Sequence, residues 1–150
     1  MVTEKEIENA VTVQAMLNQL DYLTVVPHKD REDLFTLTVD MEGEAPDVNI
    51  LLDVEESIVA LIADVCEGER QGNVVSDYTL NKAIEFNEFL LEQNAKASHG
   101  AFALNGNQVV FRENLEIENL DLNELDEAIK SVAIMVSTSI EKILEIKAVK

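Results

Sequence analysis

The spacing of hydrophobic positions at the start of the chain predicts a helix. Thr3 followed by Glu6 is a capping-box pattern, which places the helix from about Glu4 to Leu20. Its apolar residues recur at intervals of three and four positions, as on one helical face, and Val13 widens that face beyond what one core contact needs. The other apolar positions are Ile7, Ala10, Val11, Met16, Leu17 and Leu20.

After this helix the pattern changes to the two-residue alternation of strands. Phe35, Leu37 and Val39 alternate with polar neighbours, so one face of that strand should be buried and the other exposed to solvent. Short polar connectors favour antiparallel hairpins, because parallel neighbours need long crossovers. The last of the four runs is also compatible with a short helix. The runs are Tyr22–His28, Leu34–Met41, Val48–Val54 and Ile58–Val65.

A second helix is expected in the middle of the chain. Ser76 or Asp77 can cap it, and its apolar positions continue to about Lys96. Phe86 and Phe89 lie beside a stripe of Leu and Ile, so this helix is apolar over more than one face. It should therefore be buried on two sides.

The remaining third of the sequence predicts a hairpin and a long helix. Asn105-Gly106-Asn107 is typical of a tight turn, and it lies between the apolar runs Ala101–Leu104 and Val109–Arg112. Asp121 with Glu124 is another capping pattern, and one apolar helical face then continues for six turns. Ile134 and Met135 lie off that face. We therefore expect this helix to contact a second partner, as the middle helix does.

Together these segments predict one α+β domain over residues 1–150. It should have two layers, an antiparallel sheet and three helices, in the order α-ββββ-α-ββ-α. A chain of 150 residues with 47% hydrophobic and 27% charged residues is large and apolar enough to bury a core.

The order of elements resembles the type III secretion chaperones of the Tir-chaperone (CesT) family and the related YbjN-like proteins. Leu80–Leu91 is similar to the central helix of that family, and Ala101-Phe-Ala-Leu-Asn-Gly-Asn-Gln-Val-Val-Phe to its paired short strands. Leu115-Glu-Ile-Glu-Asn-Leu-Asp-Leu-Asn-Glu-Leu resembles the approach to the last helix. The resemblance implies a two-layer domain that often dimerises, has no cofactor and no catalysis, and in the secretion chaperones holds a partner's segment on apolar patches.

The charge balance is strongly acidic. Thirty Asp and Glu residues against eleven Lys and Arg give a net charge of -19. Such a field repels phosphate backbones, so direct binding of nucleic acid is not expected. The acidic residues keep the protein soluble or, alternatively, attract a basic segment of another protein.

The sequence predicts a cytoplasmic protein. Cys66 is the only cysteine, so an intramolecular disulfide is impossible. The first residues have neither the basic start nor the apolar run of a signal peptide. The longest apolar run, Ile58–Ala63, is far shorter than the roughly 20 residues that cross a bilayer.

No pattern of catalytic or metal-binding residues stands out. His28 and His99 fall in different connections, and the adjacent Ser98 lacks a positioned third group. Asn119, Asp121 and Asn123 imitate the start of a calcium loop, which then fails at its glycine and glutamate positions. We therefore predict no enzyme, no cofactor and no metal.

The first hypothesis is a non-enzymatic, chaperone-like or regulatory domain that holds a partner polypeptide on apolar surface patches. The alternatives are a self-associating, homodimeric structural domain without a client and, third, a small enzyme. The partner-binding residues predicted on the first helix are Val13, Met16, Leu17 and Leu20. The dimer-interface residues predicted on the other helices are Phe86, Phe89, Ile134 and Met135.

Overall fold

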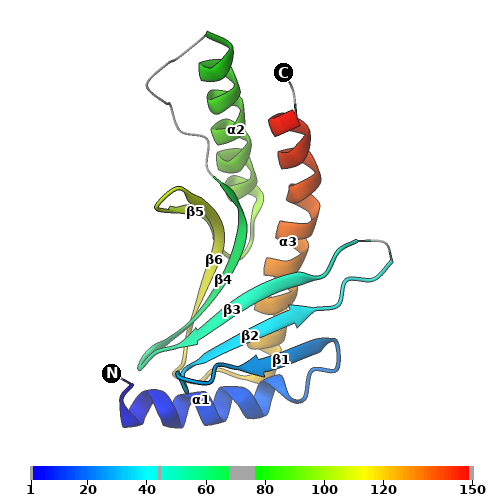
Figure 1. Ribbon diagram of the computed structural model, residues 1–150. Coiled ribbons are helices and arrows are strands. Elements are labelled where there is room, and N and C mark those ends of the chain that lie inside the picture. Colours follow the sequence, from blue (N-terminus) through cyan, green and yellow to red (C-terminus); the bar gives the residue numbers. More distant parts are fainter. Residues whose placement is uncertain (1, 44, 68–76, 149–150) are drawn as a thin grey trace.

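The computed structural model describes residues 2–43, 45–67 and 77–148, and it has the predicted α+β architecture (Figure 1). Three helices and six strands follow one another in the order α-ββββ-α-ββ-α. Ser76, one of the two predicted helix caps, lies outside the described residues. The elements are α1 (Glu4–Leu17), β1 (Leu23–Pro27), β2 (Leu34–Val39), β3 (Val48–Val54), β4 (Ile58–Glu67), α2 (Asp77–Lys96), β5 (Ala101–Asn105), β6 (Gln108–Glu116) and α3 (Leu122–Ala148).

The six strands form one sheet in the order β1-β2-β3-β4-β6-β5. Every neighbouring pair is antiparallel. The short connectors predict this for the pairs that follow one another directly in the chain, whereas β4 and β6 are separated by α2 and β5. The run Ile58–Val65, which the sequence left open between strand and helix, belongs to the strand β4. It pairs with β3 at its start and with β6 along its length.

The core lies between one face of this sheet and the helices. Phe35, Leu37 and Val39 of β2 are buried, so the alternation predicted for this strand is confirmed. Leu17 of α1 and Ile129 of α3 belong to the same buried cluster, which shows that both helices contribute to one core. The opposite face of the strands carries polar and partly exposed side chains.

Local signals in the sequence fix most of the element ends. The Glu6 amide donates to the Thr3 hydroxyl at 3.1 Å, and the Glu124 amide donates to the Asp121 carboxylate at 2.8 Å, so both predicted caps form. Helix α1 ends at Leu17 and not at Leu20, because the chain tightens into turns of the 3₁₀ type there. The Leu20 amide donates to the carbonyl of Leu17.

Two contacts attach the outer elements to the sheet. The side-chain amide of Asn9, buried in α1, donates to the carbonyls of Glu55 and Glu56 in the β3–β4 turn, each at 3.0 Å. The Tyr22 hydroxyl, next to β1, donates to Asp126 of α3 at 2.5 Å. Burial and this bond raise the pKa of Tyr22 above its ordinary value, so the hydroxyl keeps its proton as donor.

The sheet does not stay closed along its whole length. In Figure 1, β1, β2 and β3 run to one side of the molecule, whereas β4 and β6 turn toward α2, and α3 passes the divergence. Leu51 and Ile62 are the last residues in register between β3 and β4. A bulge between Asp64 and Cys66 of β4 increases the local twist just beyond that point.

Candidate functional site

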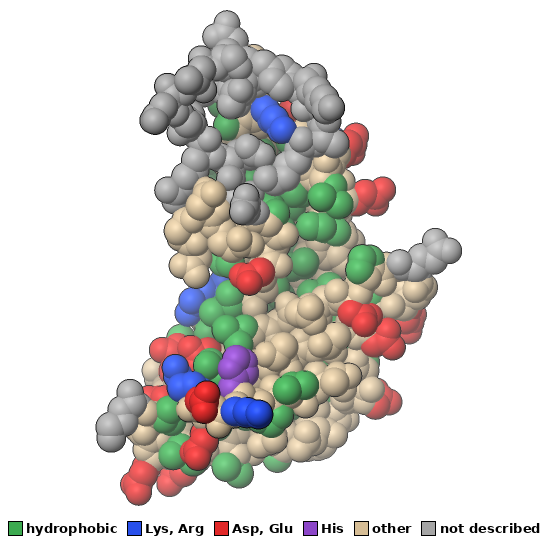
Figure 2. Space-filling model, in the orientation of Figure 1, with side chains coloured by type: hydrophobic (Ala, Val, Ile, Leu, Met, Phe, Trp, Pro, Cys, Tyr) green, Lys and Arg blue, Asp and Glu red, His purple; other side chains and the backbone are tan. Residues whose placement is uncertain are grey.

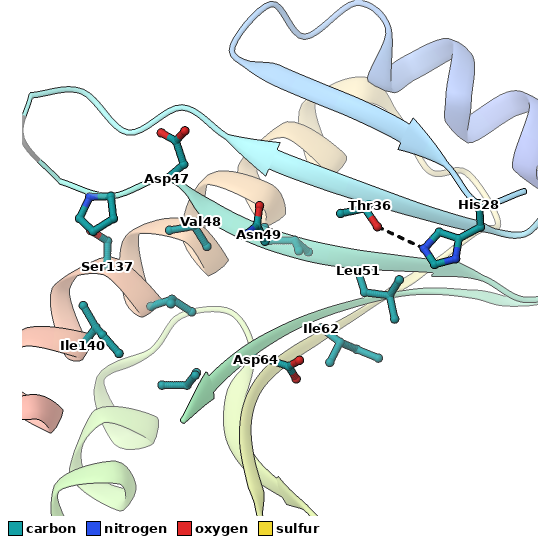
Figure 3. A pocket seen from close by; sticks show the side chains of 14 residues that line it. His28, Thr36, Asp47, Val48, Asn49, Leu51, Ile62, Asp64, Ser137 and Ile140 are labelled. Carbon is teal, nitrogen blue, oxygen red and sulfur yellow. Dashed lines mark hydrogen bonds between the residues drawn. The ribbon is translucent and has the colours of Figure 1, made fainter. Parts of the chain in front are cut away.

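A hollow opens on the outer sheet face where β3 and β4 diverge. Its volume is about 560 Å³, within the range of roughly 300 to 1,000 Å³ that is usual for ligand pockets. Figure 3 shows its walls, which come from the two strands, and its floor, which comes from α3. This hollow, the β3–β4 groove, is lined by His28, Thr36, Pro46, Asp47, Val48, Asn49, Ile50, Leu51, Ile62, Asp64, Val65, Val136, Ser137 and Ile140.

The floor of the groove is largely apolar. Val136 is buried, and Ser137 and Ile140 are half-buried, so α3 presents two aliphatic side chains around a small hydroxyl. Leu51 and Ile62 add an apolar wall where the strands meet. The same helix also contributes Ile129 and Val132 to the buried core, so the groove floor and the core share one element.

The rim of the groove is polar and acidic. Asp47, directly before β3, and Asp64 of β4 are exposed at the opening, and the exposed Asn49 of β3 also lines it. Figure 2 shows hydrophobic and acidic side chains together on this face of the molecule. With a net charge of -19 on the whole chain, this rim favours a cationic group over an anionic one.

The groove pairs one imidazole with a hydroxyl, and no carboxylate among the described residues is bonded to the second nitrogen of that ring. The His28 Nε2 atom lies 3.2 Å from the Thr36 hydroxyl, at one end of the groove. Ser137 lies at the opposite end of the groove from His28 (Figure 3). His99, the other histidine, is 3.7 Å from Glu113 and is not part of the groove lining.

A group of interacting charges outside the groove connects the segment before β2 with the end of β3. The Arg31 side chain donates to both carboxylate oxygens of Asp33, and the backbone carbonyl of Asp33 accepts from the amide of Val54. These bonds from Arg31 hold the pKa of buried Asp33 below its ordinary value. Burial and then the charge of Asp33 raise the pKa of Asp53, whose Oδ1 atom has no hydrogen-bond partner among the described residues.

The four partner-binding residues predicted on α1 divide into two pairs. Val13 and Leu17 are 2% and 0% exposed and pack in the core, so their side chains offer no surface to a partner in this structure. Met16 and Leu20 are half-buried and pack against the same core. Val13 and Met16 line a hollow of only about 60 Å³, so this face of α1 has little room for a bound segment.

The predicted dimer-interface residues are also divided between core and surface. Phe86 is fully buried, and Phe89 and Met135 are half-buried against the core. Ile134 of α3 is 56% exposed and remains on the surface. The more exposed apolar side chains of α2 and β5 are Ile84, Leu91 and Leu104.

Two other hollows lie away from the β3–β4 groove. One, of about 350 Å³, lies between α2 and β5 and contains the exposed Leu91 and Leu104. Another, of about 580 Å³, lies at the β3–β4 turn and is lined by Lys5, Glu56 and Ser57 together with the end of β6. Neither has an apolar floor supplied by α3.

The described residues supply no metal centre and no membrane helix. Across residues 2–43, 45–67 and 77–148, no three His, Cys, Asp or Glu side chains gather where they could hold a metal ion. No helix in that part of the chain is long and apolar enough to cross a bilayer.

Sequence reasoning missed the groove, although the relevant alternation is visible. Asn49, Leu51 and Asp53 share one face of their strand, and Ile62 and Asp64 share the corresponding face of the next. This alternation identifies an outer face but not the point at which two strands separate. That point depends on the register of β3 with β4 and on the bulge in β4.

Comparison with known proteins adds a family and a fold. The family model CesT_Tir_1 matches residues 6–148. A crystal structure of an uncharacterized protein from Methanothermobacter thermautotrophicus is similar with a TM-score of 0.54 and 13% sequence identity. The match covers 91% of this chain and 97% of that one, and it bears on the fold alone. No curated protein matches the chain.

Proposed function

Because the chain belongs to the CesT_Tir_1 family, we propose that it is a cytoplasmic, non-enzymatic, chaperone-like protein that holds a segment of a partner polypeptide in the β3–β4 groove. Membership of this family indicates chaperone-like protein binding. The observation that supports this particular site is the combination of an apolar floor, Val136 and Ile140, with the acidic side chains Asp47 and Asp64 at the rim.

The charge of the groove selects the kind of segment. An extended segment with alternating apolar and basic side chains can place its apolar side on α3 and its cationic side near Asp47 and Asp64. The field of the whole chain, with its net charge of -19, accelerates encounter with such a segment at low salt. An acidic segment of the same apolar content is repelled.

A synthetic peptide tests this proposal directly. The probe is a fluorescein-labelled octapeptide of four Lys-Val repeats, and its fluorescence anisotropy is measured at 50 mM and 300 mM NaCl. We expect saturable binding that weakens with salt, and no binding of the Glu-Val analogue. Ser137→Trp fills the groove floor and should abolish binding, whereas Thr138→Trp, exposed on the next position of α3, should not.

The same titration can overturn the proposal. Absence of saturable binding to the wild-type protein at 50 mM NaCl would contradict it. Equal affinities of Ser137→Trp and Thr138→Trp would contradict the site. Circular dichroism of both variants verifies that the fold is retained.

A second function, self-association, is supported by a different surface. Leu91 and Leu104 are 67% and 61% exposed and line the same hollow between α2 and β5. Burial of these side chains by a second copy of the chain would remove an apolar patch from water. Light scattering at micromolar concentration tests this: a dimer that Leu91→Glu converts to a monomer supports it, and a monomeric wild-type protein contradicts it.

A further inference from the structure

The open edge of β3 inside the groove carries backbone hydrogen-bonding groups as well as side chains. The Glu55 amide donates to the Ile58 carbonyl at 2.8 Å, which shows that Glu55 directs its backbone toward β4. Along an antiparallel strand this direction alternates, so Asp53, Leu51 and then Asn49 direct their N–H and C=O the same way. The Val54 amide donates to Asp33, on the other side, in agreement with this alternation.

Asn49 is the first of these residues without a partner strand. The register of β3 with β4 runs from Val54–Val59 to Leu51–Ile62, and no pairing continues it among the described residues. On the other side β3 pairs with β2 as far as Val48. The backbone of Asn49 is therefore directed into the groove, where a strand edge without a partner can accept another chain.

The outer edges of the sheet are less open to a new strand. At the β5 edge, the Phe102 amide donates to the Asn94 side chain at 2.6 Å, and the Asn94 amide group donates to the Phe102 carbonyl at 3.2 Å. This asparagine of α2 thus occupies both outward backbone groups of Phe102. At the other edge, β1 has five residues and ends at Pro27, which has no N–H to donate.

Side chains around the groove fit a strand with alternating chemistry. Asn49 and Leu51 lie on the outer face of β3, Asp47 directly precedes that strand, and Asp64 lies on the outer face of β4. A guest strand beside β3 would direct every second side chain to this outer face, near the two carboxylates. Its remaining side chains would point to Val136 and Ile140 of α3.

We propose that the partner segment binds as an additional β-strand, pairing its backbone with the open edge of β3 at Asn49 inside the sheet and not at either outer edge. This inference rests on the proposed function and specifies how the partner binds. The partner segment is extended and basic, with apolar residues at alternate positions. Pairing through the backbone makes affinity depend on the pattern of the segment more than on its full sequence.

Backbone methylation of the Lys-Val octapeptide tests strand pairing separately from the proposed binding function. In a bound strand the amides of alternate residues face opposite edges. A peptide methylated at all Val amides and one methylated at all Lys amides should therefore differ in affinity for the protein. We expect one of the two series to lose affinity by about tenfold or more relative to the other, as expected when backbone hydrogen bonds are removed. Equal affinities of the two methylated series would overturn strand pairing.

Amide hydrogen exchange with and without the unmodified octapeptide gives a second readout. The Asn49 amide should exchange more slowly by about tenfold or more when the peptide is bound, as expected for a new hydrogen bond. The Leu51 amide, already paired with β4, should change little. Binding that leaves the exchange of Asn49 unchanged would overturn this inference and retain the proposed function, whereas absence of binding would overturn both.

Discussion

Leu51 of β3 and Ile62 of β4 face each other across the sheet as the last pair in register before the two strands diverge. Both side chains line the groove that opens beyond them. The pair therefore marks the boundary between a closed sheet, which holds the core, and an open one, where α3 is accessible from the outer face. The proposed binding site is a consequence of this change in pairing.

Removal of the acidic rim charge should weaken the binding of a basic segment. Asp64→Asn leaves a side chain of similar shape at the groove and removes one negative charge. We expect the affinity for the Lys-Val octapeptide at 50 mM NaCl to fall by roughly two- to fivefold, the contribution of an exposed ion pair. Anisotropy titrations give the value, and the effect should shrink at 300 mM NaCl.

The matched control for this change is Glu92→Gln on α2. Glu92 is exposed and is not part of the groove lining, yet its substitution alters the net charge by the same amount. Its affinity should stay close to that of the wild type. If both variants weaken binding equally, the attraction comes from the net charge and not from the groove.

Asn9 should be a main determinant of how α1 attaches to the sheet. Asn9→Ala removes two hydrogen bonds to the carbonyls of Glu55 and Glu56 and should cost ~1–3 kcal/mol of unfolding free energy, measured by urea denaturation. Thr12→Ala removes only an exposed bond within the same helix, so its effect should lie within about 0.5 kcal/mol. Equal effects of the two substitutions would show that this contact does not stabilise the fold.

Gly100 is required by both its backbone angle and its surroundings. Its φ is +75°, and an added Cβ would lie 2.7 Å from a ring carbon of Phe111 and 2.8 Å from the carbonyl oxygen of Arg112. Gly106 also has a positive φ, +62°, but open space around it. Gly106→Ala should cost ~1–2 kcal/mol from strain alone. Gly100→Ala should lower the melting temperature further, and calorimetry showing the reverse order would contradict this packing.

The stability of the fold should depend on the ionisation of Asp53. Burial, followed by the nearby charge of Asp33, raises the pKa of Asp53 in the folded state. Protonation of this side chain therefore favours folding, and its contribution is lost as the pH rises through the raised pKa. Asp53→Asn, which stays neutral, should raise the melting temperature at pH 7.

This advantage of Asp53→Asn should disappear as the pH falls below about 3.9, where the wild-type residue is also protonated in the unfolded chain. Asp30→Asn, exposed in the loop before β2, removes the same charge and should change the melting temperature much less. A lower melting temperature of Asp53→Asn at pH 7, with Asp30→Asn unchanged, would show that the Asp53 charge is favourable in the fold.

The sequence predicts the order of elements because each has a local cause. The Thr3 and Asp121 caps form, and Gly106 takes the positive φ that the hairpin turn needs. The sequence predicts the end of α1 three residues too late, because the apolar face includes Leu20 although the chain already turns after Leu17. Packing of Leu20 against the core explains why its hydrophobic character continues past the helix.

The groove could not be predicted in the same way, because it arises from contacts between distant segments. Ile140 belongs to the apolar face of α3, and only the separation of β3 from β4 leaves it half-buried at a groove floor. Val13 and Phe86 had the character of surplus apolar positions, but the three-dimensional packing uses both in the core. Periodicity identifies apolar faces, whereas the tertiary arrangement decides which of them remain exposed.

Photo-crosslinking of the bound octapeptide tests the central claim most directly. One Val of the Lys-Val probe is replaced by photo-leucine, the complex is irradiated, and the attachment sites are located by mass spectrometry. Binding in the groove predicts attachment within residues 136–140 of α3 and to β3 or β4, with loss of these products in Ser137→Trp. Attachment concentrated at Met16 and Leu20 of α1, or at Leu91 and Leu104, would contradict the groove as the binding site.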